Sequence, residues 1–151
     1  MTAPFTVRIL SWSEALPLAR PVREKVFIEE QGVPRALEWD EWDARGDHAL
    51  ACDADGLAVG TARLLPDGRI GRMAVLRAWR GKGVGAALLR ALLDRARSRA
   101  MPRVVLHAQT RAAGFYRRFG FSEGGGEFWE AGIPHVEMRL KLPPAPTSGD
   151  G

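Results

Sequence analysis

The spacing of apolar residues in the first third of the chain predicts a strand followed by short helices. Apolar and polar side chains alternate over residues 5–10, as they do in a half-buried strand. The pattern then predicts two helices, one capped by Ser13 and one that begins at Pro21 and ends at Gly32. The polar segment 39–43, which contains two tryptophans, predicts a loop or a single helical turn.

Three strands joined by tight turns are predicted next. The apolar segments 48–52, 57–65 and 69–76 are separated by two Asp-Gly pairs, at 55–56 and 67–68. An Asp-Gly pair between apolar segments favours a hairpin, because glycine readily adopts the positive φ that such a turn requires. The segment therefore predicts an antiparallel meander.

After the meander the apolar period becomes helical. One apolar stripe runs along a long helix and consists of Val84, Leu88, Leu89, Leu92, Leu93 and Ala96. Pro102 ends this helix, and a short buried strand is predicted at 104–106. Thr110 is the predicted cap of a short helix that stops at Gly120, and alternation over 135–142 predicts a final strand.

Length and composition are those of an ordinary soluble globular protein. The chain has 151 residues, of which 46% are hydrophobic and 26% charged. We interpret residues 1–142 as a single domain and the Pro/Gly/Ser-rich residues 143–151 as a disordered tail. No apolar run approaches the roughly 18 residues needed to cross a bilayer, and the start lacks the layout of a secretory signal. We therefore expect a cytoplasmic protein that uses no membrane.

Cysteine and histidine usage argues against disulfide and metal chemistry. The single cysteine, Cys52, excludes an internal disulfide and a cysteine-based zinc cluster. The three histidines, His48, His107 and His135, are far apart in the sequence and show no metal-ligand spacing. No metal site is predicted.

Charge is divided unevenly along the chain, whose net charge is +4. Residues 29–55 carry −7, whereas residues 56–151 carry +9. Two surfaces of opposite sign would suit a site for an anionic ligand on one side and a cationic ligand on the other, although solvated faces explain the charges equally well. The arginine-rich segment 90–99 lacks interleaved aromatic residues, so a nucleic-acid partner is not expected.

A glycine-rich segment, Arg80-Gly81-Lys82-Gly83-Val84-Gly85, joins the predicted meander to the long helix. Its glycines allow a tight turn, and the first turn of a helix offers unpaired N–H groups that bind phosphate. Arg80 and Lys82 add positive charge at the same place. The segment lacks the Gly-Lys-Ser/Thr ending of a P-loop, and it does not follow the first strand as a dinucleotide fingerprint does.

These elements and motifs resemble the GNAT N-acetyltransferases. Residues 73–76 followed by 80–85 match the family's acetyl-CoA motif, and the sequence Phe-Tyr-Arg-Arg-Phe-Gly-Phe at 115–121 matches its later motif. Residues 26–31, with Glu38, Asp40 and Asp43 after them, and residues 132–138 resemble the ElaA/YjcF-type branch. The resemblance spans roughly residues 5–142.

The resemblance implies an α+β fold, with a mixed, mostly antiparallel central sheet between flanking helices. The strands at 69–76 and 103–106 would splay apart, and acetyl-CoA, the donor substrate, would enter the gap. The residues implied to bind it are Met73, Ala74, Val75, Arg80, Gly81, Lys82, Gly83, Val84, Gly85, Ala86 and Gln109. A backbone N–H in 73–75 would stabilise the negative charge that develops on the thioester carbonyl.

The resemblance also implies that Tyr116 is the general acid that protonates the CoA thiolate, although without the motif it would be interpreted as a core aromatic residue. Some relatives carry a glutamate base on the fourth strand, where this chain has Gly71 and Arg72. The general base therefore stays open in the sequence. The candidates are Glu30, Glu38, Glu130 and His135.

The acceptor is expected to be a primary amine of a small molecule or peptide. Its predicted contacts are Glu30, Glu38, Asp40, Asp43 and His135. Trp39 and Trp42 either face the cation of the amine or pack in the interior. Dimers are frequent in the family, so a homodimer is compatible with the resemblance. The alternative function is a catalytically weak module that binds acyl-CoA for sensing or regulation.

Overall fold

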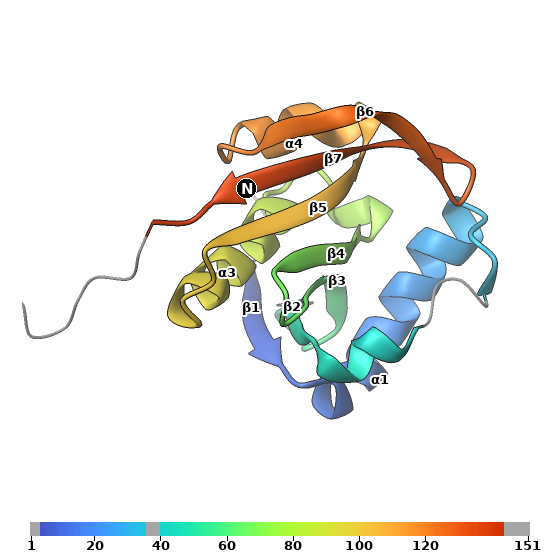
Figure 1. Cartoon of the computed structure of the whole chain (residues 1–151). Coiled ribbons are helices and arrows are strands. Elements are labelled where there is room, and N and C mark those ends of the chain that lie inside the picture. The colour runs from blue at the N-terminus through green and yellow to red at the C-terminus, as the bar shows by residue number, and fades with distance from the viewer. Residues whose placement is uncertain (1–3, 36–39, 144–151) are drawn as a thin grey trace, which may run out of the picture.

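A computed structural model describes residues 4–35 and 40–143, and its centre is a seven-stranded sheet (Figure 1). The strands are β1 (Phe5–Leu10), β2 (Asp47–Asp53), β3 (Ala58–Leu64), β4 (Arg69–Val75), β5 (Arg103–Gln109), β6 (Ser122–Glu130) and β7 (Ile133–Lys141). Their order is β1-β2-β3-β4-β5-β7-β6, and every neighbouring pair is antiparallel except β4 and β5. The predicted α+β fold with a mixed, mostly antiparallel sheet is confirmed.

Helices cover both faces of the sheet. They are α1 (Trp12–Arg23), η1 (Glu24–Glu30), η2 (Glu41–Arg45), η3 (Arg77–Trp79), α3 (Val84–Ser98), η4 (Thr110–Ala112) and α4 (Ala113–Arg117). On β2, Ala49 and Ala51 belong to the apolar cluster of α3, whereas Leu50 and Cys52 pack with Ala15 of α1. Since successive strand residues point to opposite faces, α3 and α1 lie on opposite sides of the sheet.

The prediction of two separate helices before residue 32 is wrong. One helical segment begins at Trp12 and continues through the wider π-type turns of η1, and Pro21 lies inside α1. The predicted cap Ser13 is also wrong, because the cap position is held by Ser11. Pro17 and Pro21 recur at four residues and so share one face of α1, which leaves the buried alanines on another face to pack.

The long helix α3 begins at Val84, where the predicted stripe begins, and ends at Ser98, a few residues before the predicted stop at Pro102. It packs through the predicted stripe, all six residues of which are buried. Gly60 of β3 allows the close approach. A Cβ atom at that position would lie 2.9 Å from Val84 Cγ1 and 3.0 Å from Leu88 Cδ1. The contact holds the beginning of α3 against the middle of the sheet.

The sheet divides between β4 and β5. These two strands pair only at Arg69↔Val105 and Ile70↔Leu106, and beyond that point they splay apart. The register of β3 with β4 shifts at the same level, where Arg72 has a φ of 51°. This bulge bends β4 away from its neighbour. The sheet therefore consists of two wings, β1–β4 and β5–β7–β6, joined by a short parallel seam.

Two sequence predictions lie outside the described residues. Glu38 and Trp39 belong to the segment 36–39, and all but the first residue of the predicted tail belongs to 144–151.

Candidate active site

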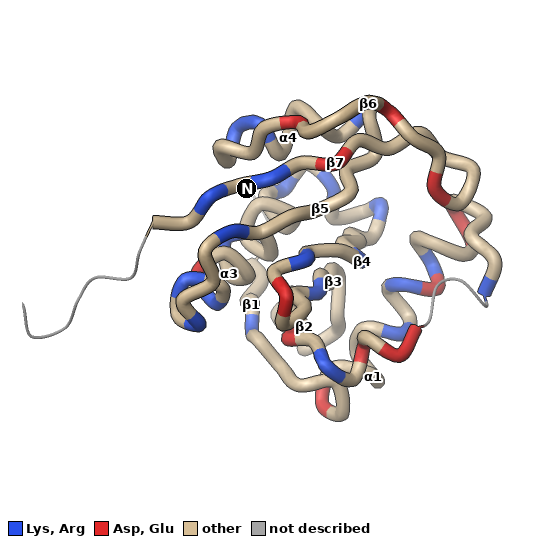
Figure 2. Tube along the Cα trace, viewed as in Figure 1, with Lys and Arg blue, Asp and Glu red and all other residues tan. Residues whose placement is uncertain are grey.

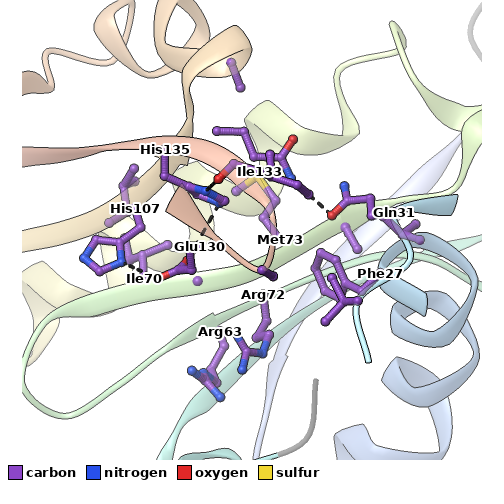
Figure 3. A pocket seen from close by; sticks show the side chains of 18 of the residues that line it. Phe27, Gln31, Arg63, Ile70, Arg72, Met73, His107, Glu130, Ile133 and His135 are labelled. Atoms are coloured by element: carbon purple, nitrogen blue, oxygen red, sulfur yellow. Dashed lines mark hydrogen bonds and ion pairs between the residues drawn. The ribbon is translucent and has the colours of Figure 1, made fainter. Parts of the chain in front are cut away.

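A cavity of about 1080 Å³ opens where the two wings separate (Figure 3). Its walls come from η1, from the segment around Asp40, from β3, β4 and β5, from the start of α4 and from the tip of the β6–β7 hairpin. Predicted site residues from distant parts of the chain meet here: Glu30, Asp40, Met73, Ala74, Val75, Arg80, Gln109, Tyr116 and His135.

The glycine-rich segment forms the predicted turn into α3. Gly81 and Gly83 have φ values of 76° and 84°, a backbone conformation that residues other than glycine rarely adopt. No side chain caps the N terminus of α3, so its first N–H groups stay available to a ligand. Of this segment only Arg80 belongs to the cavity wall, and the ammonium of Lys82 lies 5.5 Å from the Trp79 ring centroid.

Arg80 connects this turn to η1. Its Nε donates to the Val75 carbonyl at 2.9 Å, and its Nη2 donates to Glu30 Oε2 at 2.9 Å. Arg77 approaches the same carboxylate at 3.6 Å. The hydrogen bond from Arg80 lowers the pKa of Glu30, and the charges of both arginines act in the same direction. Glu30 is thus a carboxylate held by two arginines.

Tyr116 lies at the deep end of the splay. It comes from α4, and its hydroxyl donates to the sulfur of Met73 on β4 at 3.7 Å. Phe115 and Phe121 contact its ring edge to face. Burial raises the pKa of Tyr116 to about 12. The hydroxyl therefore keeps its proton throughout the physiological range and points across the gap toward β4.

Gln109, at the end of β5, bridges the cavity to η1. Its amide Nε2 donates to Gln31 Oε1 at 3.1 Å, and its Oε1 accepts from Arg111 Nε at 3.1 Å. Gln109 thus lies at the cavity wall and ties the wing of β5 to η1, and its contact with the donor stays a prediction.

Two histidines and a glutamate gather on the wing of β5, β6 and β7, and Figure 3 shows their side chains turned toward one another. His107 Nδ1 donates to Glu130 Oε1 at 3.0 Å, and His135 Nε2 lies 3.7 Å from Glu130 Oε2. His135 Nδ1 is 2.7 Å from the Ile133 carbonyl, which can only accept. The proton of neutral His135 is therefore on Nδ1, and Nε2 keeps its lone pair.

Asp43 has a structural role, which removes it from the predicted contacts of the acceptor. The residue is 2% exposed, and its Oδ1 accepts from Arg23 at 2.8 Å and from Arg63 at 3.0 Å. Burial alone would raise the pKa of this carboxyl, but the hydrogen bonds and charges of Arg23 and Arg63 outweigh it and lower the pKa. A bound amine has no access to this carboxylate.

Asp40 lines the cavity but is also paired. Its Oδ1 accepts from Arg63 Nη1 at 2.8 Å, and its Oδ2 accepts from Arg72 Nη2 at 3.0 Å. The Asp40 side chain caps η2 as well, because Oδ1 accepts from the Trp42 backbone N–H. Asp40 therefore connects the loop before β2 to β3 and β4.

Several acids of the stretch 29–55 lie next to arginines from other parts of the chain, and Figure 2 shows red and blue positions close together around the molecule. Glu30, Asp40, Asp43 and Asp47 all pair with arginines of other elements. Trp42 is likewise flanked by cations, with the guanidinium groups of Arg45 and Arg69 at 5.0 Å and 4.9 Å from its ring. These four acids are thus neutralised within the fold, and the attraction of a cationic amine to the rest of the stretch stays a hypothesis.

Comparison with known proteins agrees with this geometry. Residues 15–142 match the family model described as Acetyltransferase (GNAT) domain. The chain belongs to the GNAT acetyltransferase family. The protein named uncharacterized N-acetyltransferase YjcF, from Bacillus subtilis (strain 168), is 37% identical over 129 residues, which cover 83% of this chain and 91% of YjcF.

Solved structures of GNAT relatives share the fold. The crystal structure of Escherichia coli ElaA superposes with a TM-score of 0.82 at 28% identity, covering 91% of this chain and all of that chain. An acyl-CoA N-acyltransferase from Pseudomonas aeruginosa gives a TM-score of 0.80 at 27% identity, covering 90% and 99%. The predicted family and branch are confirmed, and GNAT proteins use acyl-CoA donors.

Among the cavity residues of this GNAT domain that were not predicted as site residues are Arg63, Arg72 and His107. Arg63 and Arg72 lie in segments assigned only to strands, and His107 was noted only for lacking metal-ligand spacing. One signal was available for Arg72, since the resemblance places it near the glutamate of some relatives. Nothing in the spacing of Arg63 or His107 marks a site, because their partners are 20 or more residues away.

In residues 4–35 and 40–143, no group of three or more His, Cys, Asp or Glu side chains is arranged to hold a metal ion. Within the same ranges, no helix combines the length and the apolar character needed to span a membrane.

Proposed function

We propose that the protein is an N-acetyltransferase that moves the acetyl group of acetyl-CoA to a primary amine by direct attack, with Tyr116 as the general acid. The observation that carries the proposal is the position of the Tyr116 hydroxyl, which points across the splay to Met73 of β4. Acetyl-CoA supplies an activated thioester. The protein has to bind and orient it, accept a proton from the attacking amine and donate a proton to the departing CoA thiolate.

The residues around the splay fit such a donor. Beyond Ile70, β4 has no strand partner on the β5 side within the described residues. Apart from the Val75 carbonyl, which accepts from Arg80, its backbone on that side can pair with an amide-bearing arm. Farther along, the turn at Gly81 and Gly83 and the N terminus of α3 suit a diphosphate. Arg80 sits between the two regions and adds charge.

Tyr116 would deliver its proton to the departing thiolate. A thiol has a pKa near 8.5 in water, so a donor whose pKa is about 12 transfers uphill there. The desolvation that raises the pKa of Tyr116 acts on an anionic sulfur in the same gap, and it favours a protonated thiol. Met73 already presents a sulfur atom as the acceptor of this hydroxyl.

Among the candidates that lie in the described residues, which leave out Glu38, His135 is the best-placed base for the acceptor amine. Glu30 is held by two arginines, and Glu130 accepts a hydrogen bond from His107. The Nε2 lone pair of His135 is free of such a bond, and the nearby Glu130 carboxylate stabilises the imidazolium that forms when Nε2 accepts a proton.

A thiol-release assay with acetyl-CoA and a panel of amines tests the proposal. Tyr116→Phe should lower kcat about 100-fold or more while the Kd for CoA, measured by calorimetry, stays within about twofold. Ser98→Ala, which removes a hydroxyl from the far end of α3, is the control and should leave both unchanged. Binding of CoA without turnover of any amine would instead support the acyl-CoA sensor.

The role of His135 has a matched test in the two partners of Glu130. His135→Gln should lower kcat at least tenfold and flatten the acidic limb of the pH–rate profile. His107→Gln, which removes the more exposed histidine, should change kcat less than threefold. Equal losses in the two variants, with unchanged pH profiles, would contradict the assignment of the base.

A further inference from the structure

The end of η1 lies across the opening between the two wings of the sheet. Glu30 accepts a hydrogen bond from Arg80, which belongs to the turn between β4 and α3, and Gln31 accepts one from Gln109 of β5. Figure 1 shows the end of this helical segment beside the tip of the β6–β7 hairpin, and Figure 3 shows Gln31 turned toward that wing. Two successive residues of η1 thus contact opposite wings.

The Arg80 side chain lies along the edge of β4 that the donor arm would use. The Leu76 N–H donates to the Val59 carbonyl of β3 at 2.9 Å, so the polar backbone groups of Val75 point to the other side, toward β5. Arg80 Nε donates to the Val75 carbonyl at 2.9 Å. In the free protein the guanidinium group therefore holds a backbone acceptor that an amide N–H of the donor could use.

The carboxylate of Glu30 binds the arginines as a phosphate would. Its Oε2 accepts from Arg80 Nη2 at 2.9 Å and lies 3.6 Å from Arg77 Nη2. Guanidinium groups bind carboxylates and phosphates through the same charge-assisted hydrogen bonds. The side chains of Arg77 and Arg80 are 80% and 43% exposed, and ion pairs this close to solvent are weak. A diphosphate at the adjacent glycine turn can therefore replace the single carboxylate.

Glu30 also reaches the side of the cavity that is assigned to the acceptor. It lines the main cavity and a second cavity of about 350 Å³, which lies between η1 and the base of β7 and is lined as well by Gln31, Gln109 and Pro134. Gln109 is paired across the β5–β7 ladder with His135, the proposed base. A carboxylate released from the arginines would therefore stay beside the part of the cavity that holds the base.

We propose that the diphosphate of the donor displaces Glu30 from Arg77 and Arg80, and that the released carboxylate then binds the ammonium group of the acceptor. The inference rests on the proposed function and adds to it the residue that couples the two substrates. In the free protein, Glu30 and the two arginines compensate one another's charge. Once phosphates bind the arginines, the carboxylate attracts a cation instead. Such a coupling is reciprocal, so the amine also strengthens the binding of the donor.

The displacement is tested by calorimetry with CoA and with inorganic pyrophosphate, which lacks the pantetheine arm. Glu30→Gln should lower the Kd of both ligands about threefold, because the competing carboxylate is gone. The gain should be smaller when Arg80→Gln is already present. Glu29→Gln removes an equal charge from the exposed neighbouring position of η1, and this control should leave both Kd values within about 1.5-fold.

The release of Glu30 to the acceptor is tested by titrating an amine with and without the donor. The probe is the amine that releases thiol fastest, or propylamine where none does. In the wild type, saturating CoA should lower the Kd of the amine about fivefold. Pyrophosphate alone should also lower it, although it has no arm that could contact the amine. In Glu30→Gln, neither ligand should change the Kd of the amine.

Steady-state kinetics should show the two substrates responding in opposite directions. Glu30→Gln should lower the KM for acetyl-CoA about threefold and lower kcat/KM for the amine about fivefold. A residue that only supported the fold would weaken the use of both substrates. The opposite signs therefore distinguish an exchange of partners from a structural role.

Three results would overturn the inference and leave the proposed function intact. They are weaker binding of CoA or pyrophosphate in Glu30→Gln, an amine affinity in the wild type that CoA does not change, and equal coupling in the wild type and in Glu30→Gln. Failure of every amine to release thiol contradicts the proposed function itself. In that event coupling between propylamine and CoA that Glu30→Gln abolishes still supports the inference, and its absence overturns it.

Discussion

The two sides of the cavity are built in different ways. The side assigned to the donor consists mainly of backbone: the edge of β4 that β5 leaves beyond Ile70, glycines with positive φ and a helix whose N terminus has no side-chain cap. The side assigned to the acceptor consists of charged side chains from η1, β3, β4 and the β5–β7 wing. A backbone surface suits a ligand that is common to a whole family, whereas side chains can change from one member to the next without loss of the fold.

The largest effect that would sharpen this contrast is on stability. Asp43→Asn removes the buried partner of Arg23 and Arg63 and should cost about 3–5 kcal/mol. Thermal unfolding should show Tm lowered by roughly 10 °C. Asp94→Asn, which breaks an exposed pair with Arg97, should change Tm by about a degree. An equal decrease of Tm in the two variants would mean that the buried ion pairs of Asp43 contribute no more to stability than an exposed pair does.

The ion pairs of Asp43 with Arg23 and Arg63 also make the stability of the protein depend on pH. The pKa of Asp43 is lowered below its ordinary 3.8, so the unfolded chain takes up this proton first as the pH falls. The stabilisation is therefore complete above about pH 5 and is lost as the pH drops through the folded-state pKa. Denaturant unfolding between pH 7 and pH 3 should show a steeper loss in the wild type than in Asp43→Asn.

Titration of Tyr116 tests the environment at the donor side. The chain has one tyrosine, so tyrosinate absorbance reports this group alone. It should rise near pH 12 in the folded protein and near pH 10 after denaturation. Because burial raises this pKa, the stabilisation is present below pH 10 and is lost as the pH rises toward 12. A folded-state midpoint at 10 would contradict the buried position of the hydroxyl.

A smaller effect is expected from the glycine turn. Gly83→Ala places a side chain at a φ of 84° and should raise the Kd for CoA about tenfold, since the N–H groups before α3 lose their arrangement. Gly56→Ala creates the same strain at a φ of 82° in the β2–β3 turn. Calorimetry should show no change in CoA affinity for this control. A similar loss in both variants would remove the turn from the donor site.

The smallest effect concerns the residue that links the two sides. Glu30→Gln frees Arg77 and Arg80 from a carboxylate and should lower the Kd for CoA about threefold, with the gain shrinking as salt rises. Glu24→Gln, on the same helical segment, is the control because it pairs with Arg20 and Arg35. Weaker CoA binding in Glu30→Gln would show that Glu30 positions Arg80.

Local sequence patterns predicted most of the secondary structure correctly. The stripe of α3 and the two Asp-Gly turns depend on neighbours within a few residues, and the sequence places them correctly. The prolines of α1 misled the prediction, because packing of Ala15, Ala19 and Val22 on the sheet keeps the helix continuous through Pro21. Tertiary contacts outweighed a local signal there.

The acceptor side could not be predicted in the same way. Asp40 meets Arg63 and Arg72 across 23 and 32 residues, and these pairings depend on the bulge of β4 and on the turn η2. Charge counting along the chain even suggested an acidic surface, since it cannot register partners from other strands. The roles of the donor residues, Tyr116 included, stay predictions that the experiments above address.

The short seam between β4 and β5 has one more consequence. Only two residue pairs connect β4 to β5 in the middle of the seven-stranded sheet. The backbone hydrogen bonds between these two strands are therefore incomplete. A ligand that binds in this opening can form the missing hydrogen bonds with β4, much as an added strand would. Hydrogen exchange of the backbone amides in β4 and β5 should therefore slow when the ligand binds. The ligand-bound protein is then more rigid than the free protein.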